Sequence, residues 1–137
     1  MKAFRNSYSA YLFLYSFYFM STALFTTLIS VYLIGQQYSA SQVSHLVSMA
    51  FFLSMLTQPL FGYINERFGI VKITTLSLVV LMAGVGGFIW APNYFWLTIF
   101  YGLVLLCLNG TAPMMEVFAT QSPYAFGKIR VWGTLGY

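Results

Sequence analysis

The sequence predicts an all-α membrane protein, and three observations support this fold class. Of the 137 residues, 60% are hydrophobic and only 6% are charged, whereas a soluble domain is about 25% charged. Four apolar runs reach the roughly 18 residues that a membrane-spanning helix needs. The alternating ten-residue segments of a membrane β-barrel are absent from the sequence. The chain has too little polar surface for a cytosolic enzyme or a disordered tail, so we expect it to lie in a lipid bilayer.

The four apolar runs are the expected spans. The first covers residues 8–34 and would be about 40 Å long as a helix, which exceeds the roughly 30 Å hydrocarbon core. The others cover residues 42–64, 73–90 and 94–116. The links between them are short, which makes neighbouring helices antiparallel. Residues 1–137 are therefore expected to form a single partial helical bundle.

A fifth apolar segment covers residues 125–137. As a helix it would reach only about 20 Å, which is too short to cross a membrane. We therefore expect the chain to be the front part of a longer protein, interrupted inside its fifth helix.

The basic residues predict how the chain is oriented. They lie before the first span, between the second and third, and after the fourth, while the other two links carry no charge. Because positive charge collects on the cytoplasmic side, this pattern places the N-terminus in the cytoplasm of a multi-pass protein of the inner or plasma membrane. The six residues are Lys2, Arg5, Arg67, Lys72, Lys128 and Arg130.

The same composition argues against several functions. The net charge of +4 is spread along the chain, without the basic patch of a nucleic-acid site. Cys107 and His45 are single residues of their type, so no metal site is expected. One histidine and two acids do not supply a nucleophile–His–acid set, and no enzyme activity or cofactor is expected.

A polar segment after the second span has the pattern Gly-x-x-x-acid-Arg-x-Gly, formed by Gly62, Glu66, Arg67 and Gly69. Gly62 would let a helix end approach a neighbour, and Gly69 would permit a tight turn. From spacing alone, a simple polar turn explains the segment equally well. The segment also resembles the loop signature of the major facilitator superfamily. That resemblance implies a latch between the two halves of a transporter, although Ile70 and Val71 replace usual basic residues.

Glu116 ends the fourth apolar run, and Arg130 lies inside the fifth. Charged groups within spans are costly and tend to face a cavity or a partner. Because a short turn separates the two helices, both side chains can lie at the same depth. An Arg–carboxylate pair suits binding of sugar hydroxyls or other polar groups. The alternative is that both residues are anchors at the membrane edge.

Three segments, residues 54–62, 109–116 and 127–137, resemble the lactose permease-like (oligosaccharide:proton symporter) family. The resemblance implies a twelve-helix transporter, of which this chain would supply helices 1–4 and the start of helix 5. It implies that Glu116 and Arg130 hold the sugar and that Tyr137, in place of a tryptophan, stacks on it. It further implies proton-driven symport without a cofactor, and a missing C-terminal half as partner.

Two alternatives stay open from the sequence. Proton symporters for nucleosides or aromatic acids share part of the fifth-segment pattern. A stand-alone small membrane protein, either an exporter or an assembly subunit, is the other alternative. The aromatic residues of the first span, between Tyr11 and Phe19, are interpreted as packing and lipid contacts.

Overall fold

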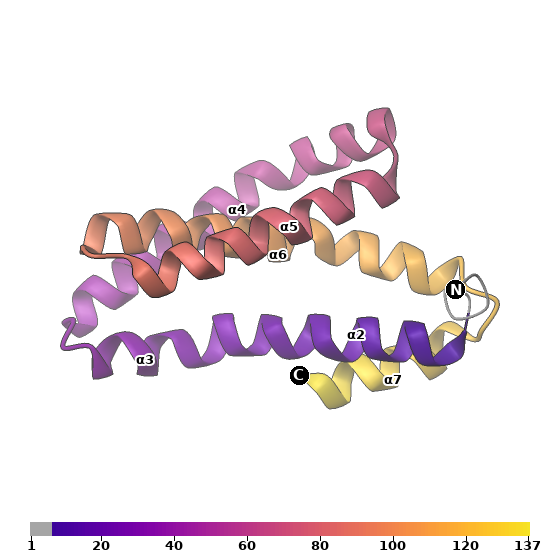
Figure 1. Cartoon of the computed structure of the whole chain (residues 1–137), viewed down its shortest axis with the longest axis horizontal. Coiled ribbons are helices and arrows are strands. Elements are labelled where there is room, and N and C mark those ends of the chain that lie inside the picture. The colour runs from indigo at the N-terminus through magenta and orange to yellow at the C-terminus, as the bar shows by residue number, and fades with distance from the viewer. Residues whose placement is uncertain (1–6) are drawn as a thin grey trace. The chain divides into compact units, whose positions relative to one another are not determined.

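The computed structural model describes residues 7–137, and all its regular elements there are helices (Figure 1). Four helical stretches are long and apolar enough to cross a membrane: Tyr8–Gly35, Ala40–Phe68, Ile70–Trp90 and Tyr94–Thr120. The all-α class expected from the sequence is therefore confirmed. Lys2 and Arg5, on which part of the expected orientation depends, lie outside the described residues.

The first stretch is not a uniform α-helix. It consists of α2 (Tyr8–Ala23), a π-helical turn η1 (Leu24–Leu28) and α3 (Ile29–Gly35). The hydroxyls of Thr22 and Thr26 each donate to the carbonyl four residues earlier, at 3.0 and 2.8 Å. Such bonds compete with the backbone ladder and often bend helices, and the π-helical turn lies at this point.

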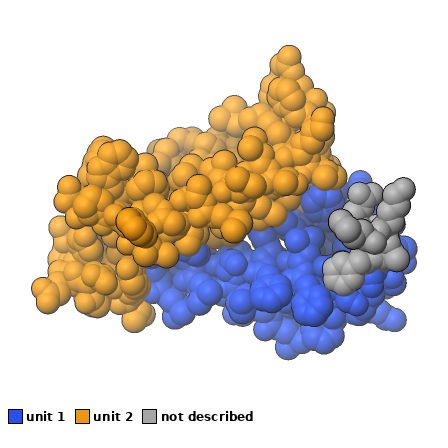
Figure 2. Space-filling model, in the orientation of Figure 1, with its two compact units in different colours: residues 1–29, 115–137 blue, residues 30–114 orange. Residues whose placement is uncertain are grey.

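The chain forms two compact units, coloured separately in Figure 2. One unit contains residues 30–114, with α4 (Ala40–Phe68), α5 (Ile70–Trp90) and most of α6 (Tyr94–Thr120). The other contains the N-terminal residues to Ile29 and residues 115–137, with α2, the end of α6, and α7 (Phe126–Gly136).

Helices α4 and α5 meet at a single residue, Gly69. Its φ of 90° is favourable for glycine and strained for other residues. The expected polar link of residues 65–72 is therefore wrong in length, because the helices continue to Phe68 and restart at Ile70. The turn that Gly69 was expected to make is present.

The two uncharged links, one between α3 and α4 and the other between α5 and α6, lie together at one end of the unit formed by residues 30–114. A capping box of Ser39 and Gln42 begins α4, which satisfies two otherwise unpaired backbone donors. The Tyr94 hydroxyl, at the start of α6, donates to the Gln42 carbonyl at 2.9 Å. The rings of Tyr38 and Tyr94 lie 5.7 Å apart. The helices of this unit therefore alternate in direction, as short links require.

Close helix contacts and buried hydrogen bonds hold the same unit together. Gly87 lies against the Phe100 ring and Gly110 against Phe61, so closely that a Cβ atom would collide with the ring. Ser54, buried in α4, donates to the Leu105 carbonyl at 3.2 Å. These features are typical of helix packing in membranes, where small residues let backbones approach and short polar side chains link helices.

In the other unit, α7 packs along α2 (Figure 1). A Cβ atom on Gly136 would lie 2.5 Å from the Ser16 carbonyl oxygen, so the two backbones nearly touch. The Ser16 hydroxyl donates to the Trp132 carbonyl at 3.2 Å. The Trp132 indole N–H donates to the Tyr8 hydroxyl at 2.9 Å, and that hydroxyl donates to the Lys128 carbonyl at 3.3 Å. This packing fixes which face of α2 lies against α7.

Candidate functional site

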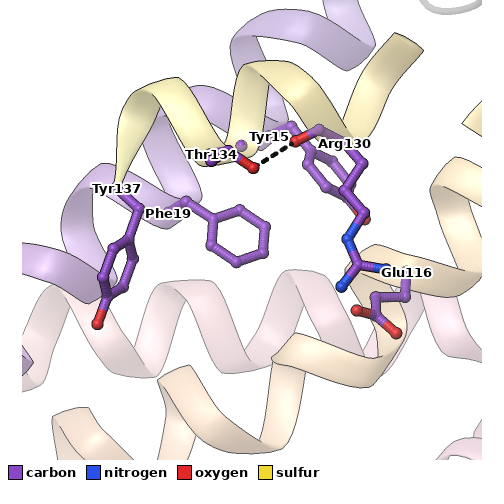
Figure 3. Close-up of a pocket in the computed structure, with 7 residues that line it drawn as sticks. Tyr15, Phe19, Glu116, Arg130, Thr134 and Tyr137 are labelled. Atoms are coloured by element: carbon purple, nitrogen blue, oxygen red, sulfur yellow. Dashed lines mark hydrogen bonds between the residues drawn. The ribbon is translucent and has the colours of Figure 1, made fainter. Parts of the chain in front are cut away.

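A pocket of about 240 Å³ lies within the unit formed by α2, the end of α6 and α7 (Figure 3). Its volume lies just below the roughly 300–1,000 Å³ range of small-molecule sites. Its walls carry one acid, one base, one threonine, one glycine and three aromatic residues, two of which are tyrosines. The residues are Tyr15, Phe19, Glu116, Arg130, Gly133, Thr134 and Tyr137.

The three residues expected from the sequence to contact a solute all line this pocket: Glu116, Arg130 and Tyr137. Glu116 comes from the last turns of α6, Arg130 from the first turns of α7, and Tyr137 directly follows α7. The structure therefore brings them together across the short turn, residues 121–125. Their binding role stays a prediction.

The charged side chains occupy one part of the pocket. Figure 3 shows the Arg130 guanidinium directed toward the Glu116 carboxylate. The Arg130 guanidinium carbon also lies 5.6 Å from the centre of the Phe126 ring, within cation–π range. In the following turn, the Thr134 hydroxyl donates to the Arg130 carbonyl at 3.3 Å. The guanidinium keeps N–H donors that a polar solute could accept from.

Aromatic rings form the other part. Phe19 lies between the charged groups and Tyr137 in Figure 3, and its ring centre lies 5.4 Å from that of Tyr15. Such rings offer flat apolar faces, while the carboxylate and guanidinium offer an acceptor and planar donors. The pocket therefore suits a small solute with one polar edge and one apolar face.

Sequence reasoning missed Tyr15 and Phe19, which were interpreted as packing residues of an aromatic run. The signal available was their spacing of four residues, which puts them on one face of α2. That signal was insufficient, because aromatic residues also lie on the opposite face of this helix. In the structure, contact with Gly133 of α7 marks these two rings, because a Cβ atom on Gly133 would lie 2.9 Å from both the Phe19 and the Tyr15 ring.

A family model, the MFS_1 like family, matches residues 8–137. The chain belongs to this family of the major facilitator superfamily. No curated protein and no solved structure matches the chain. Membership points to a transporter rather than an enzyme, and with the four apolar helices it makes the chain a multi-pass membrane protein.

The segment that resembles the superfamily loop signature lies outside the pocket, at the junction of α4 and α5. Gly62 and the exposed Glu66 and Arg67 lie on α4, and Gly69 ends it. Arg67 donates to the Tyr63 hydroxyl at 3.3 Å. Beyond its own helix backbone and chain neighbours, no described atom lies within 4 Å of a Cβ built on Gly62, and the close approach expected there stays a prediction. The latch role of the segment stays a prediction.

Within residues 7–137, no three His, Cys, Asp or Glu side chains gather at one place. Cys107 is buried on α6.

Proposed function

We propose that this member of the MFS_1 like family is a secondary active transporter that carries a small polyhydroxylated solute, a sugar or oligosaccharide, in symport with protons. The observation that supports it is the pocket in which Glu116, Arg130 and Tyr137 come together. The family match supports transport in general, and the substrate class rests on the chemistry of the pocket walls.

The pocket chemistry favours a neutral polyol over a simple ion. A carboxylate and a guanidinium on adjacent helices can accept from and donate to neighbouring hydroxyl groups of one solute. The less polar face of a sugar ring can lie on Tyr137 or Phe19. A lone anion would satisfy only the arginine, and a lone cation only the glutamate.

Uptake into vesicles tests this function. The intact protein, reconstituted in lipid vesicles, is expected to accumulate radiolabelled lactose or sucrose when the vesicle interior is made alkaline, because protons then flow inward with the solute. Dissipating the gradient with an ionophore should abolish accumulation, and vesicles without protein give the control. Accumulation of uridine alone would reassign the substrate to nucleosides, and sugar accumulation that ignores the gradient would contradict proton symport.

We also propose that the chain starts on the cytoplasmic side of the inner or plasma membrane, which rests on the distribution of the basic residues. In a Cys107→Ser background, cysteines placed at Gln37 and Asn93 should react with an impermeant maleimide from outside intact cells. A cysteine at Arg67 should react only after the cells are opened. Reaction of the Gln37 site only in opened cells would overturn this orientation.

A further inference from the structure

The hydroxyl of Tyr15 is the feature of the pocket that its expected residues leave unexplained. Tyr15 is only 1% exposed, and its hydroxyl oxygen is buried without a hydrogen-bond partner among the described residues. Buried polar groups are nearly always hydrogen-bonded, and leaving one unpaired is unfavourable. An unpaired hydroxyl that persists in the wall of a pocket is a candidate contact for a ligand.

The Tyr15 ring is held in place by its neighbours, so the hydroxyl cannot easily turn toward another partner. Gly133 of α7 leaves just enough room for the ring, since a Cβ atom there would lie 2.9 Å from it. Phe19 covers the ring one turn further along α2, with the ring planes at 40°. Both neighbours also line the pocket.

The Tyr15 side chain shares its part of the pocket with the charged side chains. Glu116 and Arg130 line the same pocket as Tyr15. In Figure 3 the Arg130 side chain extends past the Tyr15 ring toward Glu116. Arg130 is exposed and has a long, flexible side chain. We expect a solute that shifts this side chain to gain access to the buried Tyr15 hydroxyl.

The other buried, unpaired side-chain atom of the described residues gives a useful contrast. It is Oδ1 of Asn65, on α4 in the other unit, and Asn65 does not line this pocket. Among the described residues, only Tyr15 combines an unpaired, buried hydroxyl with a place in the pocket wall.

We propose that Tyr15 is a specificity-determining residue, whose hydroxyl forms a hydrogen bond with one hydroxyl group of the solute beside Glu116 and Arg130. This inference rests on the proposed function. A phenol hydroxyl both donates and accepts, which complements an acceptor-only carboxylate and a donor-only guanidinium. The three groups together select a solute with several neighbouring hydroxyls over one that lacks any of them, because each absent hydroxyl leaves a buried group unpaired.

The test compares Tyr15→Phe with the parent protein in two measurements. Calorimetric titration of the intact protein uses whichever of lactose, sucrose and uridine binds the parent. We expect Tyr15→Phe to bind that probe about three- to tenfold more weakly, the usual effect of one neutral hydrogen bond. Monodeoxy derivatives of the probe, each lacking one hydroxyl, then identify the hydroxyl that Tyr15 contacts. The derivative that lacks this hydroxyl should bind the parent more weakly than the probe does. It should bind the parent and Tyr15→Phe with equal affinity.

The second measurement is thermal unfolding without solute. Removing an unpaired buried hydroxyl should leave the melting temperature unchanged or raise it, whereas removing a structural hydroxyl lowers it. Tyr11→Phe is the matched control, since Tyr11 lies one turn earlier on α2 and does not line the pocket. Its affinity should equal that of the parent.

The outcomes separate this inference from the proposed function. If Arg130→Lys weakens binding but Tyr15→Phe binds as tightly as the parent, the role of Tyr15 is overturned and the pocket stands. A lower melting temperature for solute-free Tyr15→Phe than for Tyr11→Phe also overturns that role. If no probe binds, or neither variant changes affinity, the proposed function fails and the inference fails with it.

Discussion

Replacing Glu116 by Gln is expected to weaken solute binding about 10- to 100-fold, because hydrogen bonds to charged groups contribute about 1.5–3 kcal/mol. Glu116 is the one acid in the pocket wall, and it faces Arg130 across the turn from α6 to α7. The amide keeps the size of the side chain but accepts more weakly and has no charge. Calorimetric titration of the intact, purified protein with the sugar that it transports measures the change.

Thr120→Ala is the control for this variant. Thr120 lies one turn after Glu116 on α6 and donates to the Glu116 carbonyl at 2.6 Å, but it does not line the pocket. Its affinity for the sugar should be that of the parent. An unchanged affinity in Glu116→Gln would mean that the carboxylate is an interfacial group without a role in binding.

Adding a methyl group at Gly136 is expected to destabilise the protein by about 1–3 kcal/mol, the usual effect of overpacking. A Cβ atom there would lie 2.5 Å from the Ser16 carbonyl oxygen. Because this atom belongs to the backbone of α2, a side-chain rotation cannot relieve the collision. Gly136→Ala should therefore separate α7 from α2. Thermal unfolding of the purified protein in detergent measures the loss.

Gly127→Ala is the matched control on the same helix. Beyond its own helix backbone and chain neighbours, no described atom lies within 4 Å of a Cβ built on Gly127, and alanine favours a helix over glycine by about 1 kcal/mol. This variant should be at least as stable as the parent. Equal stability of Gly136→Ala and Gly127→Ala would contradict the close contact between α2 and α7.

The helices could be predicted from the sequence, but their ends could not. A run of apolar residues marks where a chain crosses a membrane, and hydropathy says little about how far the helix continues outside it. Helix α4 therefore extends from the expected end at residue 64 to Phe68, and α6 from 116 to Thr120. What ends α4 is the backbone of Gly69, with its positive φ, which apolar periodicity does not reveal.

Part of the pocket could be predicted for a related reason. Glu116 and Arg130 are conspicuous because charged residues are rare in and near apolar runs. Tyr15 and Phe19 belong to a helix with aromatic residues on two opposite faces, so its own sequence does not show which face lines the pocket. The packing of α7 against α2 determines which face lines the pocket, since Gly133 lies directly against both rings. Such a contact joins residues more than a hundred positions apart.

The affinity of Arg130→Lys, relative to the parent, tests most directly whether this pocket holds the solute. Lysine keeps the positive charge and most of the length of the side chain, but it loses the planar fork that can donate two parallel hydrogen bonds. Titration of both intact proteins with the transported sugar should show binding at least about tenfold weaker in the variant. Equal affinity would contradict the proposed site and would make Arg130 and Glu116 anchors at the membrane edge.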